Sequence, residues 1–178
     1  MKGHNFTIQH MERVALYLYR IATKMQLPDQ DRIFAYFAGL LHDVGKDEMD
    51  EELLLMPRGL TEAEFEHIKA HTVAGYEILM MRTDIVPSFK RLAEAARWHH
   101  ERLDGSGYPD GLQGDEIPLL ARLVSVADAF DAMTEERPYK RPKTVEEALQ
   151  ELSRCAGTQF DPVVVKAMTA AVQSPEKI

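Results

Sequence analysis

The residues His42-Asp43-Val44-Gly45-Lys46 end an apolar run that extends from Ile33 to Leu41. A neutral imidazole next to a carboxylate at a helix end offers nitrogen and oxygen to one divalent metal ion, without any thiolate. One such pair is weak evidence, but the chain places more ligands of the same types at helical positions: His10, His71, His99, His100 and Asp128. These are too many for one ordinary core, and they predict a buried metal centre.

Length and composition bound the other properties of the chain. We expect a single domain over residues 1–178, which is enough chain to bury a substantial core. The net charge of -8 argues against binding of DNA or RNA, which needs a basic surface, although a small anionic substrate stays open. No uncharged apolar segment approaches the roughly 20 residues that cross a bilayer, and no signal peptide is recognisable. We therefore expect a cytoplasmic protein without a membrane partner, in which the only cysteine, Cys155, packs rather than reacts.

Apolar residues recur at helical spacing along the whole chain, and no segment alternates with period two for long enough to predict a strand. Capping signals add to this pattern at Asp29, at Thr61 with Glu64, at Thr144 with Glu147, and at Asp161 before Pro162. The expected helices cover about 7–25, 29 to the His-Asp pair, 61–81, 87–101, 117–135, one from 144, and 161–173. The sequence thus predicts an all-α fold of about seven helices.

Several polar segments allow two interpretations. His67 lies four residues before His71 and could share its face, but a half-exposed polar role is favoured. The acidic stretch 47–52 is expected to be surface, and the loop 104–111, taken alone, is a plain connector. Asp131 is expected to serve as a cap or as a hydrogen-bond partner of a metal ligand. The cationic run 137–143 is either a solvated face or a phosphate-binding segment.

Seven motifs in order resemble the HD-GYP family, a branch of the HD metal-dependent phosphohydrolases, over nearly the whole chain. They are His10 with Glu12-Arg13-Val14-Ala15; His42 to Lys46; His71 with Gly75; His99-His100-Glu101 with Asp104 to Pro109; Ala127 to Ala132; Arg137-Pro138-Tyr139-Lys140; and Gly157 to Pro162. Any one of them is weak evidence. Seven at family-like spacing are highly specific.

The resemblance implies a compact helical domain that hydrolyses cyclic di-GMP to linear pGpG and often on to GMP, with two divalent metal ions, typically iron or manganese. The residues that match the first metal's ligands are His10, His42, Asp43 and Asp128. Asp43 matches the bridging carboxylate, and the residues that match the second metal's ligands are His71, His99 and His100. Lys46, Arg137 and Lys140 match phosphate-contacting residues, and the loop Gly107, Tyr108 and Pro109 borders the substrate cleft.

Chemistry favours the same assignment. Two cations about 3.5–4 Å apart lower the pKa of a bridging water and neutralise charge on phosphodiester oxygens. Catalysis would then rest on Asp43 and Lys46, with Lys46 stabilising the phosphoryl oxygens and helping to protonate the leaving 3′ oxygen. Two alternatives stay open: a non-catalytic receptor of cyclic di-GMP that presents its Gly-Tyr-Pro loop to a partner, and a phosphohydrolase acting on another nucleotide, including a mixed cyclic dinucleotide.

The family usually fuses this domain to a receiver or sensor domain, and we recognise neither in this chain. The expected partners are cyclic di-GMP, a GGDEF-type or other signalling protein, and a second copy of the chain. One departure from the family bears on the metal count. Some members use a glutamate one helical turn before the first histidine as a ligand for a third metal, and Phe6 stands at that position here. A phenyl ring cannot coordinate a cation, so the sequence predicts two metals.

Overall fold

The computed structural model describes residues 2–50, 53, 56, 58, 61–84, 86–135 and 141–174, and for residues 2–7 only the backbone. Within these ranges it contains seven α-helices and no strand. The α-helices are α1 (Lys2–Lys24), α2 (Asp29–Leu41), α4 (Glu62–Met80), α5 (Phe89–Trp98), α6 (Leu119–Thr134), α7 (Val145–Arg154) and α8 (Pro162–Gln173). Two short 3-10 helices, η1 (Val44–Glu48) and η2 (Gly114–Glu116), complete the described elements. The expected all-α fold is confirmed.

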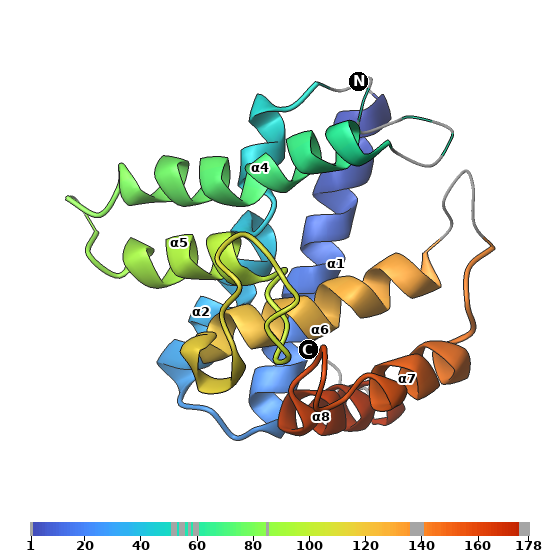
Figure 1. Ribbon diagram of the computed structural model, residues 1–178. Helices are drawn as coiled ribbons and strands as arrows, with labels where there is room; N and C mark the ends of the chain where they lie inside the picture. Colours follow the sequence, from blue (N-terminus) through green and yellow to red (C-terminus); the bar gives the residue numbers. More distant parts are fainter. Residues whose placement is uncertain are drawn as a thin grey trace.

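Helix α1 is the element against which the others are arranged. It packs against α2, α6 and α8, while α4 and α5 lie side by side and α4 also contacts η1 (Figure 1). Val14, Leu18, Ile21 and Ala22 recur at helical spacing on α1 and are fully buried, so they form its core face. On α6, Leu120, Leu123, Val124 and Ala127 are buried as well, whereas the neighbouring Asp128 is only partly buried.

Most of the expected helix boundaries hold to within two residues, and two capping boxes explain why. Thr61 accepts from the backbone of Glu64 while the Glu64 side chain accepts from the backbone of Thr61, and Thr144 and Glu147 form the same reciprocal pair. Asp161 accepts from Val163 N at 2.8 Å and begins α8 with Pro162 in its first turn, as expected. Each of these caps satisfies backbone N–H groups that have no partner inside the helix.

Three expectations about the helices are wrong. Asp29 is the first residue of α2 rather than its cap; the cap position belongs to Pro28, which has no side-chain donor or acceptor. Helix α1 begins at Lys2, before the expected start. The unbroken apolar run from Ile33 to Leu41 suggested a central, largely buried helix, but Ile33 and Phe37 are 54 % and 46 % exposed. The small residues of α2, not the large ones, face its neighbours.

Two glycines permit the close helix contacts that bring the His-Asp pair into the interior. A Cβ atom on Gly39 would lie 2.4 Å from the Cα of Ala15, so α2 can cross α1 at this distance only without a side chain. A Cβ on Gly45 would lie 2.0 Å from the carbonyl oxygen of His71 and 2.5 Å from the backbone nitrogen of Gly75. The turn after the His-Asp pair therefore packs backbone to backbone on α4.

Candidate metal centre

The polar side chains predicted to bind metal come together from five helices, α1, α2, α4, α5 and α6. His10 comes from α1, Asp43 follows α2, and His71 comes from α4. His99 and His100 directly follow α5, which ends at Trp98, and this position just beyond the helix lets both rings reach one site. Their ring centroids are 4.0 Å apart. Residues separated by up to 118 positions in the sequence, from His10 to Asp128, thus meet.

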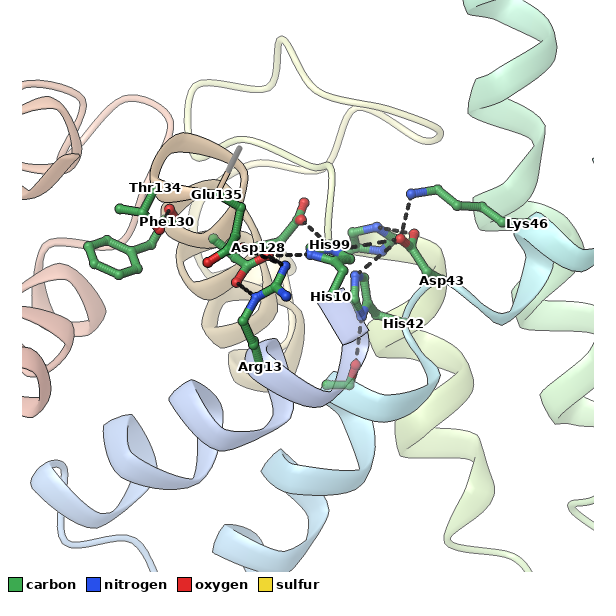
Figure 2. A network of polar contacts seen from close by, with 12 residues as sticks. His10, Arg13, His42, Asp43, Lys46, His99, Asp128, Phe130, Thr134 and Glu135 are labelled. Atoms are coloured by element: carbon green, nitrogen blue, oxygen red, sulfur yellow. Dashed lines mark hydrogen bonds and ion pairs between the residues drawn. The ribbon is translucent and has the colours of Figure 1, made fainter. Parts of the chain in front are cut away.

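Asp43 lies at the middle of this arrangement, as Figure 2 shows for His10, His42 and His99. Its Oδ1 lies 3.4 Å from Nε2 of His71 and 3.9 Å from Nε2 of His99. Its Oδ2 lies 3.4 Å from Nε2 of His42 and 3.8 Å from Nε2 of His10. Each oxygen of one buried carboxylate therefore faces a different pair of imidazoles.

The ligand atoms divide into two groups, each compact enough to hold one ion. His10, His42 and Asp43 form one group, and His71, His99 and His100 form the other; within each, the donor atoms lie within 4.8 Å of one another. Asp128 approaches the first group, with Oδ1 at 3.2 Å from Nε2 of His10. This grouping matches the two ligand sets implied by the family resemblance.

Hydrogen bonds at Nδ1 aim three of the imidazoles inward. Nδ1 of His42, His71 and His99 lies 2.8, 2.6 and 2.9 Å from the carbonyl oxygen three residues earlier. A carbonyl oxygen can only accept, so each Nδ1 carries the proton and each Nε2 presents its lone pair. Metal-binding histidines use this arrangement, because the second hydrogen bond fixes both the tautomer and the ring orientation.

His10 is oriented differently, by carboxylates. Its Nδ1 lies 2.7 Å from Oδ2 of Asp131, and Arg13 donates to the same carboxylate through Nε at 2.7 Å. Asp131 is buried, and it fills the expected role of a residue that supports a metal ligand. Arg13, one turn after His10 on α1, was not predicted to take part. The sequence signals for it were its place in the first motif and its i, i+3 spacing from His10.

The pKa of His10 and the pKa values of the second histidine group are shifted in opposite directions. Burial lowers the pKa of His10, but hydrogen bonds with Asp128 and Asp131 outweigh this effect and raise the pKa to about 9. Burial lowers the pKa values of His71, His99 and His100, the last to about 4. The second group is therefore neutral imidazole near pH 7, which is the form that binds metal. The carboxylates that raise the pKa of His10 would equally attract a cation to the first group.

Two buried atoms among the described residues have the chemistry of metal ligands and lack a hydrogen-bond partner. Nε2 of His42 and Oδ1 of Asp43 are buried without a hydrogen-bond partner. Such atoms cost free energy unless a partner compensates, and both belong to residue types that ligate divalent metals. The donor set thus fits a metal ion at the position where the two groups meet.

Lys46 and the Gly-Tyr-Pro loop border this centre. The Nζ of Lys46 donates to Oδ2 of Asp43 (Figure 2). A cavity of about 310 Å³ opens over His99, His100 and Asp128 and is lined in part by Gly107 and Tyr108. The Tyr108–Pro109 peptide bond is cis, and Pro109 is not among the cavity-lining residues.

The remaining predicted residues lie elsewhere. His67 is exposed and joins neither group, in agreement with the favoured interpretation. Arg137 and Lys140 lie outside the described residues, and so does the side chain of Phe6.

Glu101 was quoted only as part of a motif, yet it is buried and its Oε1 accepts from the backbone nitrogens of Asp110 and Gly111 at 2.7 and 3.0 Å. It anchors the loop that carries Tyr108.

No helix in the part of the chain that the structure describes is long and apolar enough to cross a membrane.

Several known proteins are similar to this chain in sequence and in architecture. It is 45% identical over 161 residues to a "Cyclic di-GMP phosphodiesterase" of Thermotoga maritima, which covers 90% of this chain and 43% of the relative. It is 40% identical over 167 residues to the "3'3'-cGAMP-specific phosphodiesterase 3" of Vibrio cholerae, covering 94% of this chain and 35% of the relative. The chain therefore spans less than half the length of these relatives.

A solved structure of an HDG"Y"P protein from Bdellovibrio bacteriovorus has the same fold, with a TM-score of 0.74 at 19% identity over 94% of this chain and 52% of that one. The family model described as HD domain matches residues 3–164. The chain belongs to the HD domain family, in the HD-GYP branch that its motifs predict.

Proposed function

We propose that the chain is a metal-dependent phosphodiesterase that hydrolyses cyclic di-GMP to linear pGpG. The observation that carries the proposal is the position of Asp43, whose two carboxylate oxygens face two separate groups of imidazole nitrogens. A carboxylate with nitrogen donors on both sides could bridge two metal ions, which lie about 3.5–4 Å apart in two-metal hydrolytic centres. The Thermotoga maritima relative, named a cyclic di-GMP phosphodiesterase, supports the choice of substrate.

The proposed ligands divide between two ions as the donor groups do. His10, His42 and Asp128 would hold one ion, the residues of the second group would hold the other, and Asp43 would contact both. Nitrogen and oxygen donors without thiolate suit iron or manganese. When bound, such a pair of ions supplies an activated water and neutralises charge on the phosphodiester oxygens.

The chain's own side chains complete the chemistry. Lys46 lies on the bridging carboxylate and would donate to a phosphoryl oxygen, and its ammonium is also the proposed source of the proton for the leaving 3′ oxygen. Burial, with Asp128 and Asp43 nearby, raises the pKa of Tyr108, so its hydroxyl stays protonated and can donate to the substrate. Arg137 and Lys140 are proposed to hold the second phosphate, on the evidence of sequence alone.

A second candidate is hydrolysis of a mixed cyclic dinucleotide. The relative from Vibrio cholerae is named for 3'3'-cGAMP and is 40% identical to this chain, close to the identity of the cyclic di-GMP enzyme. The residues that would hold the metals face the phosphodiester, which is the same in both nucleotides. The residues that contact the bases must therefore decide between them.

We further propose two metals rather than three, because Phe6 stands where a third metal would need a carboxylate. Such a centre suffices for the first hydrolysis to pGpG. Other expectations remain predictions. They are that residues 1–178 form one domain, that the protein is cytoplasmic and binds no nucleic acid polymer, and that it pairs with a GGDEF-type protein or with itself.

The test is incubation of the manganese- or iron-loaded chain with cyclic di-GMP, with products separated by chromatography and metal measured by elemental analysis. We expect pGpG and two metals per chain. Asp43→Ala should lose both metal and activity. Full activity in Asp43→Ala would overturn the proposal, binding without hydrolysis would favour the receptor alternative, and three metals per chain in active protein would contradict the metal count.

A further inference from the structure

The cavity beside the metal centre has a second wall, formed by Phe65 and Lys69 of α4, which the chemistry above does not use. Tyr108 lines the same cavity. Ring contacts lead outward from the donors: His100 stacks on Tyr108 with centroids 4.8 Å apart, and Tyr108 meets Phe65 edge to face at 6.1 Å. A nucleotide with its phosphate at the metals would extend its base along this line of rings.

Phe65 has no core role that would explain it. The buried face of α4 consists of His71, Thr72, Gly75 and Leu79, whereas Phe65 is 43 % exposed at the cavity. A single exposed apolar side chain is ordinary on a protein surface. This one lines a cavity that also contains metal-ligand candidates and a second aromatic ring, which is the combination that nucleotide-binding proteins use for stacking.

Lys69 lies one turn after Phe65 and holds its ammonium over both rings. Nζ lies 4.8 Å from the centroid of Phe65 and 5.3 Å from that of Tyr108, and it contacts Oε1 of Glu66 at 2.5 Å. An ammonium has three donors and no acceptor, so the contact with Glu66 leaves donors for a ligand. The lysine is thus held where the edge of a stacked base would lie.

The chemistry of this edge distinguishes the two purines. Guanine presents two adjacent acceptors, O6 and N7, while adenine presents N7 beside an amino group that donates. A lysine can only donate, so it can bind both O6 and N7 of guanine. On adenine only N7 accepts, and the amino group beside it offers the lysine no acceptor. We propose that Phe65, Lys69 and Tyr108 form a base-recognition subsite that selects guanine over adenine. This inference rests on the proposed function, since it concerns the same substrate cavity.

The test compares cyclic di-GMP with cyclic di-AMP on the metal-loaded chain, using Lys69→Met and Phe65→Ala. The wild type should prefer cyclic di-GMP in kcat/KM. Lys69→Met should reduce that preference by about tenfold or more, the discrimination that one good contact to a base edge provides. The change should lie in KM, with kcat nearly unaffected. Phe65→Ala should raise KM for both nucleotides, because stacking does not depend on the base.

Lys90→Met is the matched control. Lys90 also pairs with a glutamate on its own helix, Glu94 at 3.7 Å on α5, but its side chain is 63% exposed and does not line the cavity. It should leave the preference unchanged. Metal content and circular dichroism equal to those of the wild type establish that the Lys69→Met and Phe65→Ala proteins are folded.

The outcomes separate the inference from the proposed function. If the wild type hydrolyses cyclic di-GMP but shows no preference for it, or if Lys69→Met keeps the full preference, the subsite is wrong and the phosphodiesterase stands. If the wild type hydrolyses neither nucleotide, the proposed function is wrong. The subsite is then tested by the ratio of the dissociation constants of the two nucleotides, measured for the wild type and the same variants. Absence of binding overturns both.

Discussion

Arg13 and Asp131 form a two-point contact, in which Nε lies 2.7 Å from Oδ1 and Nη2 lies 3.0 Å from Oδ2. The guanidinium holds the carboxylate in the plane from which Oδ2 reaches Nδ1 of His10. Two residues, one on α1 and one on α6, thereby fix the imidazole of His10 at the candidate metal centre.

Asp131→Asn should therefore weaken metal retention without removing any ligand. Loss of such a supporting carboxylate typically costs 10–100-fold in metal affinity, by the general behaviour of metal sites. Competition with a chelator, followed by elemental analysis, measures the effect. Asp115→Asn is the control, because the Asp115 side chain is fully exposed and pairs only at the surface with Arg122. Equal metal affinity in the two variants would remove Asp131 from the centre.

Metal removal should lower the melting temperature. Nε2 of His42 and Oδ1 of Asp43 are buried without hydrogen-bond partners among the described residues, and a bound ion would compensate both atoms. Free metal at 100 times its dissociation constant stabilises the folded state by about 2.7 kcal/mol, which corresponds to about 5–10 °C for a domain of this size. Differential scanning calorimetry with and without chelator tests this. The same shift in Asp43→Ala would show that the ion binds elsewhere.

Arg137→Ala and Lys140→Ala should each weaken substrate binding by roughly 1.5–3 kcal/mol, the range for charge-assisted hydrogen bonds, and leave metal content intact. Isothermal titration with the substrate and elemental analysis give the two quantities. Arg141→Ala is the matched control, since Arg141 belongs to the same cationic run and is exposed. If neither variant differs from this control, the run is a solvated face.

Glu101→Ala should release the loop that carries Tyr108. The substitution leaves the backbone N–H groups of Asp110 and Gly111 without their carboxylate acceptor, at a cost of about 1–3 kcal/mol. Trp98, the only tryptophan, donates its Nε1 to Asp110 at 2.7 Å, so its fluorescence reports on the loop. Glu101→Gln retains an acceptor oxygen and should keep the wild-type emission. Unchanged emission in the alanine variant would exclude this anchor.

Lowering the pH should break the hydrogen bond between Trp98 and Asp110 at a predictable pH. Hydrogen bonds from Arg97 and then Trp98 lower the pKa of Asp110 below its usual value. A lowered folded-state pKa stabilises the fold above the unfolded-state pKa of about 3.9, and this contribution is lost as the pH falls through the folded-state pKa. The emission of Trp98 should therefore stay constant down to about pH 4 and change below it. Asp110→Asn should show no such transition, and a change centred near pH 6 would contradict the assignment.

The sequence predicted the helices well because their signals are local. The capping boxes at Thr61 and Thr144 and the pairing of Asp161 with Pro162 need only residues within one turn. Asp29 was assigned incorrectly because a residue type that favours caps also occurs in the first turn of helices. The exposure of Phe37 was missed for another reason: hydrophobic character alone does not reveal how many neighbours surround a helix.

The candidate site could likewise be predicted only in part from the sequence. Residue types and spacing indicated the donors, and the family resemblance grouped them, but nothing in the sequence placed Arg13 on Asp131 or Glu101 beneath the loop. Both contacts join segments that the chain brings together only on folding. Lys69 was likewise unremarkable in the sequence, since its relation to Tyr108 depends on how α4 packs beside the loop.

The backbone contact at Gly45 has a further consequence for the choice of metal. Asp43 lies two residues before this glycine, and the carbonyl of His71 lies against the space where its Cβ would be. Asp43 and His71, which face each other across the two donor groups, are thus held by a contact between main-chain atoms, which cannot adjust as side-chain rotamers can. We therefore expect the centre to discriminate between cations by ionic radius, because Asp43 and His71 cannot move closer together without a backbone clash.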